Sequence, residues 1–164
     1  MSGAKDDVKI ATIDSGSDGA RLRAAGELLA KFSEREKGRK ALSKAEAESL
    51  VRAVASAKSL SRYILAFDRD GKACGLLLLA VCPGVYGDWG LVSELYVEEG
   101  QPAALAEKLL VAAVEYGVAS KLRYVTALMP AAGEKTNPDR KALLEIVDRL
   151  AFEKNETVLA EKTL

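Results

Sequence analysis

The segment RYILAFDRDGKACGLLLLAV, residues 62–81, constrains the fold more than any other part of the chain. Its two apolar runs stand on either side of Asp70-Gly71, a pair that readily adopts the positive φ angles of a tight turn. We therefore predict an antiparallel hairpin with strands at 63–67 and 74–81. The second run is apolar on both faces, which is typical of a strand in the centre of a sheet.

A strand and two helices are predicted before the hairpin. VKIATI (8–13) alternates as a strand does, and the turn residues DSGSDG end it. Apolar residues then recur three or four positions apart from 19 to 37, which predicts a helix with Gly38 as its stop. SKAE (43–46) is a capping box, in which Ser43 and Glu46 each bond the other's backbone, and it predicts the start of a second helix.

The chain after the hairpin alternates strands and helices. The Gly-rich segment CPGVYGDWG, 82–90, predicts an irregular connection that carries Tyr86, Asp88 and Trp89. The elements predicted after it are a strand at 91–97, a helix at 102–119, a strand at 123–129, a helix opened by Asn137-Pro138 and a strand at 157–164. The order β-α-α-β-β-β-α-β-α-β predicts one domain, 1–164, of the α/β (α+β) class. Its central sheet is expected to be mixed, mostly antiparallel and flanked by helices.

Composition excludes several classes of function. The 24 Lys and Arg residues balance 24 Asp and Glu residues, so no overall field draws the chain to nucleic acid or to a membrane surface. The absence of His removes His-based triads and the usual zinc sites, so no metal is expected. Residues 1–17 lack the apolar core of a signal peptide, and the longest apolar run, 76–82, is too short to span a bilayer. We therefore expect a cytoplasmic protein.

The two cysteines are interpreted as reduced. Cys74 and Cys82 lie eight residues apart on one predicted strand, which rises about 3.3 Å per residue and so holds them too far apart to bond each other. We expect both to be small buried residues without a redox role.

Residues 93–110, SELYVEEGQPAALAEKLL, form a strand, a turn and a helix. With the order of elements, this segment resembles the GNAT (N-acetyltransferase) superfamily, whose three-layer fold binds acetyl-CoA or another acyl-CoA. The superfamily's cofactor motif is Gln/Arg-x-x-Gly-x-Gly/Ala, and it is similar to QPAALA here; Gln101 and Ala106 match it, whereas Ala104 replaces a Gly. The resemblance implies that the cofactor contacts Leu95, Tyr96, Val97, Gln101, Ala103, Ala104, Leu105 and Ala106.

The departures from this motif have physical consequences. Backbone N–H groups at a helix N-terminus bind pyrophosphate, and glycines give the ligand clearance. Pro102 has no N–H, and Ala104 adds a methyl group. Carboxylates at Glu98, Glu99 and Glu107 would each cost about 1 kcal/mol at ~4 Å from an anion in water, so they must point away from a bound cofactor. The alternative is a plain strand-to-helix turn, which a Pro at the first helical position favours.

Glu94 is the candidate general base. It lies two residues before Tyr96, where members of the superfamily often carry an acidic residue that takes a proton from the acceptor amine. Strand alternation predicts that Glu94 and Tyr96 share one face and that Leu95 and Val97 share the other. The alternative interpretation of Glu94 is a solvated strand residue.

The candidate general acid is not at the usual place. The C-terminal part of the chain is similar to the superfamily's closing helix and strand, with Ala151-Phe152 at its Gly-Phe step. Four residues before that step many members carry a Tyr that protonates the leaving thiolate, but this chain has Val147. Tyr124, Tyr116 or a water would have to replace it.

The resemblance implies an acyl-CoA-dependent N-acetyltransferase in which a small-molecule or peptide amine attacks the thioester directly. Tyr86, Asp88 and Trp89 are candidates for binding a cationic acceptor through charge and cation–π contacts, although a lone Trp beside a strand most often packs in a core. The alternative is a non-catalytic GNAT-like module for CoA binding or protein interaction. A homodimer is a further expectation, because many proteins of this type pair through C-terminal strands.

Overall fold

The computed structural model describes residues 8–35, 40–56, 58, 60–129 and 139–152. The elements in this part of the chain are β1 (Lys9–Ile13), α1 (Gly19–Ser33), α2 (Lys44–Ser56), β2 (Arg62–Phe67), β3 (Ala73–Cys82), β4 (Trp89–Val97), α3 (Ala104–Ala119), β5 (Val125–Ala127) and α4 (Arg140–Arg149). Their order confirms the prediction from β1 to α4. The strand predicted at 157–164 and the Asn137-Pro138 helix start lie outside the described residues.

The five strands form one sheet in the order β1-β2-β3-β4-β5. β1, β2, β3 and β4 pair with one another in antiparallel fashion, and β5 pairs with β4 in parallel, so the predicted mixed, mostly antiparallel sheet is confirmed. The β2–β3 hairpin turns at Asp70-Gly71, where Gly71 has a φ of 78°. β3 lies at the centre of the sheet, as its apolar sequence predicts.

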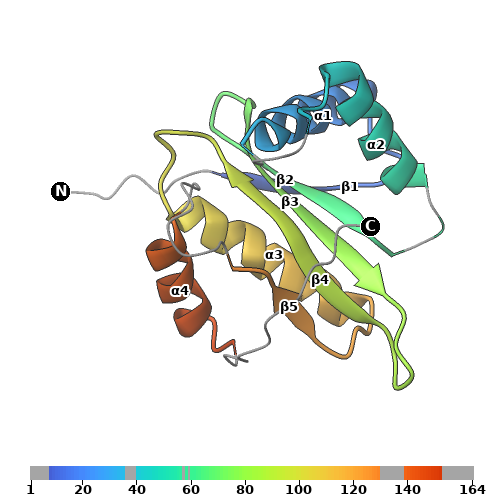
Figure 1. Cartoon of the computed structure of the whole chain (residues 1–164), viewed down its shortest axis with the longest axis vertical. Helices are drawn as coiled ribbons and strands as arrows, with labels where there is room; N and C mark the ends of the chain where they lie inside the picture. Colours follow the sequence, from blue (N-terminus) through green and yellow to red (C-terminus); the bar gives the residue numbers. More distant parts are fainter. Residues whose placement is uncertain (1–7, 36–39, 57, 59, 130–138, 153–164) are drawn as a thin grey trace.

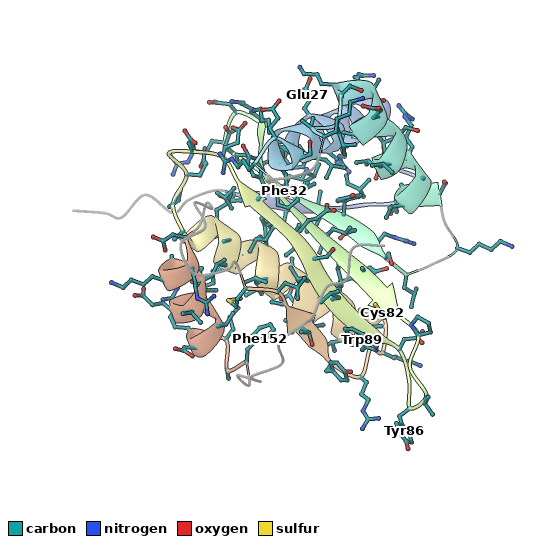
Figure 2. All side chains as sticks on the ribbon, in the orientation of Figure 1. Glu27, Phe32, Cys82, Tyr86, Trp89 and Phe152 are labelled. Atoms are coloured by element: carbon teal, nitrogen blue, oxygen red, sulfur yellow. The ribbon has the colours of Figure 1, made fainter. Side chains whose placement is uncertain are left out.

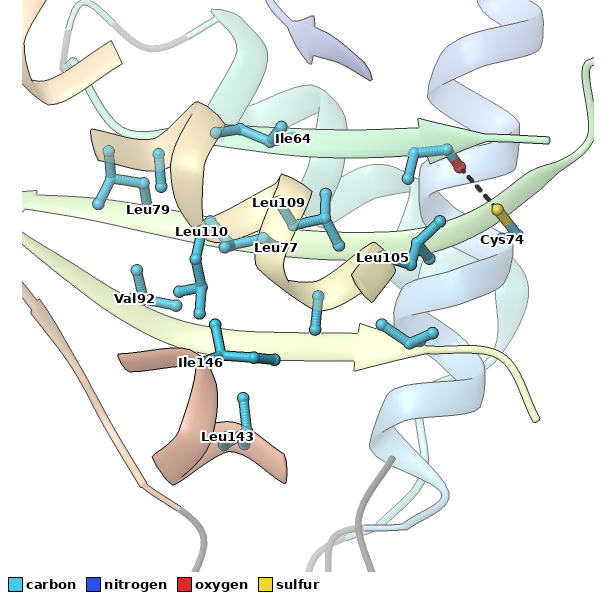
Figure 3. Close-up of a cluster of buried hydrophobic side chains, with 14 residues drawn as sticks. Ile64, Cys74, Leu77, Leu79, Val92, Leu105, Leu109, Leu110, Leu143 and Ile146 are labelled. Atoms are coloured by element: carbon cyan, nitrogen blue, oxygen red, sulfur yellow. Dashed lines mark hydrogen bonds between the residues drawn. The ribbon is translucent and has the colours of Figure 1, made fainter. Parts of the chain in front are cut away.

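Helices cover both faces of the sheet and make three layers (Figure 1). α1 and α2 pack on one face, against residues such as Ile13, Leu65 and Leu76. α3 and α4 pack on the other face, against Ile64, Leu77 and their neighbours (Figure 3). Side chains alternate between the two faces along each strand, and both faces of β2 and β3 are covered. Successive residues of these strands therefore enter two separate apolar clusters.

Local side-chain bonds explain where the helices begin. The predicted capping box is confirmed: the N–H of Ser43 donates to Glu46 Oε2 at 2.8 Å, and the N–H of Glu46 donates to Ser43 Oγ at 3.2 Å. Asp18 caps α1 and Asp139 caps α4, each accepting from a backbone N–H at 2.8 Å. No helix of the described segments combines the length and apolarity needed to cross a membrane.

Several predicted boundaries were wrong. α1 ends at Ser33 rather than at residue 37, because the Ser33 hydroxyl donates to the Ala30 carbonyl and accepts from the Leu42 N–H. Trp89 was predicted on a connection but begins β4, opposite Cys82. α3 begins at Ala104 rather than at residue 102, and β5 spans three residues instead of seven.

The two cysteines are free and lie on β3, as predicted. Cys74 is buried and its thiol donates to the Ala66 carbonyl at 3.5 Å (Figure 3). Burial raises the pKa of this thiol to about 11, so it stays protonated and unreactive at neutral pH. Cys82 was also expected to be buried, but it is half-buried near the end of the strand.

Candidate functional site

β4 changes its pairing in the middle of the strand. On the β3 side, Leu78 pairs with Glu94 but Leu79 pairs with Val92, so Ser93 is one extra residue and forms a β-bulge. On the β5 side, the parallel register covers Gly90–Val92 only, and the N–H of Leu128 adds a bond to the Val92 carbonyl. β4 therefore runs on for five residues after the register with β5 ends, and this part carries Glu94 and residues 95–97.

The predicted faces of β4 are confirmed. Tyr96 packs in the cluster under α1 and α2, and Glu94 pairs with Leu78, which packs against that cluster. Leu95 and Val97 pack on the opposite face with α3 and α4. The candidate base is thus on the α1/α2 face. The side chains of Leu95 and Val97 anchor this end of β4 to the layer formed by α3 and α4.

Glu94 is half-buried, and its Oε2 atom is shielded from solvent. Tyr63, a residue that is 4% exposed, lies on the same face of the sheet two strands away from Glu94, and Leu78 pairs with both residues. Burial raises the pKa of Tyr63, and the negative charge of Glu94 raises it further, so Tyr63 stays neutral at physiological pH. We did not anticipate Tyr63 from the sequence; the only signal was a single hydroxyl in the otherwise apolar run YILAF.

The turn between β4 and α3 is tight and partly closed on itself. Gly100 has a φ of 81°, and the Gln101 N–H donates to the Glu98 carbonyl at 3.2 Å. The Leu105 N–H donates to the Pro102 carbonyl at 2.9 Å, and the Ala106 N–H donates to the Ala103 carbonyl at 3.0 Å. These two donors of the predicted cofactor site are therefore occupied within the first turn of α3.

The predicted cofactor residues of the turn are exposed to very different degrees. Ala103 and Ala104 are exposed, Gln101 is half-buried, and Leu105 and Ala106 belong to the core. α3 also differs from α1 and α4 at its start, because its N-cap is Ala103 and no side chain caps it. The N–H groups of Ala103 and Ala104, which precede the bonds inside the turn, are the donors best placed to meet an anion.

The acidic residues around the turn are all paired with cations. Glu98 binds Lys31 from α1 and also Lys72 from the β2–β3 hairpin, at 3.4 Å. Burial acts to raise the pKa of Glu98, but the hydrogen bond from Lys31 and the two positive charges outweigh it and lower the pKa. In the same region, Glu99 Oε1 lies 3.2 Å from Arg35.

At the start of α3, Glu107 forms an ion pair with Arg149 of α4 at 2.7 Å. The hydrogen bond from Arg149 lowers the pKa of Glu107. Together with the pairs of Glu98 and Glu99, this bond directs the acidic residues toward neighbouring elements of the fold.

The predicted acceptor residues gather at the opposite end of β4 (Figure 2). The rings of Trp89 and Tyr124 stack with centroids 5.6 Å apart, and the Arg123 guanidinium lies 5.4 Å from the ring centre of Tyr86. The carbonyl of Asp88 accepts from the Arg123 N–H at 2.8 Å. This end of the strand is five residues, about 16 Å, from Glu94.

The structure therefore brings Tyr124 together with the predicted acceptor residues and not with Glu94. Tyr116, the second candidate acid, lies on α3 and donates its hydroxyl to the Leu60 carbonyl at 2.9 Å. Val147 is buried in α4.

The predicted Ala151-Phe152 step does have the geometry of a Gly-containing helix end. Ala151 has a φ of 56°, in the left-handed region that favours Gly. The Phe152 N–H donates to the Val147 carbonyl and the Ala151 N–H to that of Asp148.

Two hollows of the described surface lie away from Glu94. One of about 720 Å³ lies between β1 and α3 and includes Ile10, Thr12 and Ala104. The other, of about 270 Å³, lies among α3, β5 and the end of α4. The described residues contain no group of His, Cys, Asp and Glu side chains suited to hold a metal ion.

Comparison with known proteins supports the fold. No protein-family model matches the chain, and no curated protein matches it by sequence. Among solved structures, it is similar to an aminoglycoside acetyltransferase from an uncultured soil metagenomic sample, crystallised with sisomicin. The TM-score is 0.72 at 14% identity, over 96% of each chain.

Two further solved structures have the same fold. AAC(6')-Iy in complex with the bisubstrate analogue CoA-S-monomethyl-acetylneamine matches 96% of this chain and 98% of its own, with a TM-score of 0.69 at 14% identity. A ribosomal-protein-alanine N-acetyltransferase from Brucella melitensis matches 95% and 99%, with a TM-score of 0.67 at 13% identity. The chain therefore has the three-layer fold of the GNAT acetyltransferases, which confirms the resemblance predicted from its sequence.

Proposed function

We propose that this chain, which has the GNAT fold, is an acyl-CoA-dependent N-acetyltransferase that acts on an amine. The observation that carries the proposal is the course of β4: the register with β5 ends at Val92, Glu94 follows directly after the bulge, and the strand leads into an α3 N-terminus without a side-chain cap. The Glu94 carboxylate, the backbone of the end of β4 and the N-terminus of α3 therefore follow one another along the chain.

In this proposal the acyl-CoA donor lies along the end of β4. The backbone of residues 95–97 pairs with its pantetheine arm, Gln101 lies beside the turn, and the N–H groups of Ala103 and Ala104 meet the pyrophosphate. Leu105 and Ala106 contribute by fixing the start of the helix, since their side chains are in the core. The donor supplies the acyl group in the activated form of a thioester.

Glu94 attracts the acceptor amine and accepts its proton, directly or through water, because a free amine is needed for attack and an ammonium group has a pKa near 10. The amine nitrogen then forms a bond to the thioester carbonyl carbon while the bond from that carbon to sulfur breaks. The β4 backbone N–H groups stabilise the charge that develops on the carbonyl oxygen. The thiolate leaves and takes a proton from water, since Tyr124 lies far along the strand and Tyr116 is bonded to Leu60.

The acceptor is proposed to be a small-molecule or peptide amine. Two of the similar structures are described as an aminoglycoside acetyltransferase and a ribosomal-protein-alanine N-acetyltransferase, so the fold serves amines of both kinds. Tyr86, Asp88 and Trp89 would contact only an extended acceptor, one that spans the ~16 Å between Glu94 and the far end of β4.

A second candidate function is a GNAT-like module that binds CoA or a protein without catalysis. The specific observation in its favour is the closed turn: Pro102 has no N–H, and the N–H groups of Leu105 and Ala106 already bond within the turn. A site with two remaining backbone donors would bind the pyrophosphate less well than one with four.

Thermal unfolding with acetyl-CoA, CoA and ATP tests the binding step. At a ligand concentration a hundred times Kd, linkage stabilises the protein by about 2.7 kcal/mol, which raises Tm by roughly 5 to 10 °C. We expect shifts with acetyl-CoA and CoA, and none with ATP. Absence of a shift with both acetyl-CoA and CoA at millimolar concentration would refute the cofactor assignment.

The exposed position of Ala104 gives a matched pair of variants for the same measurement. Ala104→Glu adds a negative charge at the helix start, whereas Ala104→Gln adds nearly the same volume without charge. We expect Ala104→Glu to weaken CoA binding more than Ala104→Gln does. Equal affinities in the two variants would mean that the phosphates do not meet this end of α3.

Acyl transfer itself is tested by release of free CoA thiol with a panel of amines. An active protein whose kcat falls about 10²-fold or more in Glu94→Gln supports Glu94 as the base. A protein that binds acetyl-CoA but releases no thiol with aminoglycosides, polyamines or peptide N-termini would favour the non-catalytic module.

A further inference from the structure

The hollow of about 720 Å³ lies between α3 and β1, the strand at one end of the sheet order. α3 packs on β2, β3 and β4 through another face, which carries Leu109 and Leu110. The hollow is therefore lined by Ile10 and Thr12 of β1 on one side and by an outer face of α3 on the other. We call the central line of this face the α3 stripe. It consists of Ala104, Lys108, Val111, Ala112, Glu115 and Ala119.

The α3 stripe has the same spacing in both directions along the helix. Its members are separated by 4, 3, 1, 3 and 4 positions, which keeps them on one face over the whole of α3. Val111 and Ala112 are half-buried at the centre, and the alanines at the two ends are exposed. Between the centre and the ends stand two charges of opposite sign, Lys108 on one side and Glu115 on the other.

This pattern makes the α3 stripe complementary to itself. When two copies of a helix pair antiparallel about a two-fold axis, residue i of one copy faces residue j of the other, and residue j faces residue i. With the axis between Val111 and Ala112, a larger side chain faces a smaller one at the centre. Lys108 then faces Glu115 of the second copy, and Ala104 faces Ala119 of the second copy.

The two charges select the antiparallel arrangement. Lys108 and Glu115 are seven positions apart, which is two turns or about 10 Å along the helix. An antiparallel pair of helices therefore forms two ion pairs, one on each side of the axis. In a parallel two-fold pair each residue would face its own counterpart, so that Lys108 would meet a lysine and Glu115 a glutamate.

Two other residues that line the hollow already have partners in their own chain. Glu107 forms its ion pair with Arg149, and the Tyr116 hydroxyl donates to the Leu60 carbonyl. Their polar groups are satisfied without a second copy, so docking on this face does not leave either of them buried without a hydrogen-bond partner.

We propose that this hollow is the docking surface for a second copy of the chain, whose α3 lies antiparallel along the α3 stripe. The contact uses the same surface on both copies, so the assembly closes as a dimer. The occupant is the chain itself because the stripe matches its own reverse in spacing, side-chain size and charge. The inference does not depend on the proposed function, and it assigns the expected homodimer to α3 instead of the C-terminal strands.

Sedimentation velocity of the whole chain tests the dimer directly. Over a range of roughly 1 to 100 μM we expect a species with twice the 17.5 kDa mass of one chain. A monomer at every concentration would overturn the inference and leave the hollow to a ligand of another kind. Failure of the protein to transfer acyl groups would refute the proposed function but would have no bearing on the dimer.

Reversal of the charges tests which surface forms the dimer. Lys108→Glu and Glu115→Lys each replace two ion pairs by two like-charge contacts, so we expect either variant to raise the dimer Kd about tenfold or more. The double variant exchanges the charges and should return Kd to within about threefold of the wild-type value. Single variants that dimerise as tightly as wild type, or a double variant weaker than both, would overturn the inference.

Arg23→Glu is the matched control for the charge reversals. Arg23 is exposed on α1, on the opposite face of the sheet, and the substitution changes the net charge by the same amount as Lys108→Glu. We expect it to leave the dimer Kd unchanged. If Arg23→Glu weakens the dimer as much as Lys108→Glu does, the effect is one of overall charge and the inference fails.

A second pair of variants tests the position of the axis. Ala112→Arg places two long cations side by side at the centre of the contact, so this variant should be monomeric where wild type is dimeric. Val118 lies on the same helix, is 73% exposed and does not line the hollow, so Val118→Arg should remain dimeric. A dimeric Ala112→Arg variant would exclude this axis and overturn the inference.

Discussion

Leu105→Ala is the substitution that best tests how the turn between β4 and α3 is held. Leu105 is 1% exposed and lies in the core cluster under the first turn of α3 (Figure 3). A Cβ atom added at Gly75 would lie 2.8 Å from Leu105 Cδ2, so the leucine rests directly on the β3 backbone. The start of α3 is therefore fixed by apolar packing, whether or not a ligand binds there.

The expected loss of stability follows from this burial. Removing three buried carbon atoms costs about 2.4 kcal/mol at ~0.8 kcal/mol each, and the cavity that remains adds to this, so we expect about 3 kcal/mol. The better helix propensity of Ala recovers only a few tenths of a kcal/mol. For a chain of 164 residues, this corresponds to a fall in Tm of roughly 6 to 12 °C.

The assay is urea or thermal unfolding, with Leu50→Ala as the control. Leu50 is 47% exposed on α2, so the same substitution there should change the free energy of unfolding by less than about 0.5 kcal/mol. A loss below about 1 kcal/mol in Leu105→Ala would mean that α3 does not dock through this residue. The buried position also makes Leu105→Asp useless as a probe of phosphate binding, because the carboxylate would enter the core.

Three further predictions concern packing, pH and capping. Gly75→Ala should destabilise by about 1–3 kcal/mol, because its methyl group meets Leu105 and Leu109 at 3.0 Å or less, and calorimetry measures this. The pKa of Glu98 is lowered in the folded state, so its contribution to stability is present above the unfolded pKa of about 4.3 and is lost as pH falls through the folded pKa. The unfolding midpoints of wild type and Glu98→Gln should therefore converge between about pH 7 and pH 3. A constant difference between the two midpoints would contradict this. Ser43→Ala should cost about 1 kcal/mol by chemical denaturation, and no loss would mean that the capping box is not formed in solution.

Local patterns in the sequence predicted most of the elements and few of their boundaries. The turn at Gly71 and the box of Ser43 and Glu46 are encoded by residues within four positions of one another, so periodicity and turn chemistry were sufficient. The end of α1 depends instead on a bond between the Ser33 hydroxyl and the Leu42 N–H, across nine positions. The early start of β4 at Trp89 depends on pairing with β3, which a Gly-rich sequence does not reveal.

The candidate site was predicted in part for the same reason. Strand alternation placed Glu94 and Tyr96 on one face correctly, because it is a property of one strand. Tyr63 and Glu94 lie on strands that are two apart in the sheet, and the bulge at Ser93 shifts the register between them. Neither this placement nor the bulge can be deduced from the sequence without knowing the pairing.

The ion pairs around the turn resolve the main objection that the sequence raised against anion binding. Taken alone, EEGQPAALAE brings three carboxylates close to a helix start that would have to accept phosphates. In the folded chain, Glu98, Glu99 and Glu107 are held by four cations. Lys31 lies on α1 and Arg35 just after it, Lys72 lies in the β2–β3 hairpin, and Arg149 lies on α4. Among these seven side chains, three negative charges thus meet four positive ones.

The ion pairs of Glu98 and Glu99 also set the shape of the turn, which in the superfamily's usual motif depends on glycines. A Gly-rich turn reaches its ligand-binding shape through backbone freedom. This turn has a single positive-φ residue, Gly100, and its shape is set by bonds to Lys31 and Arg35, which are 67 and 64 positions away from their partners in the sequence. Pro102 restricts it further. A turn so constrained would lose little additional entropy when an anion binds, so fewer backbone donors suffice for a given affinity than in a flexible glycine turn.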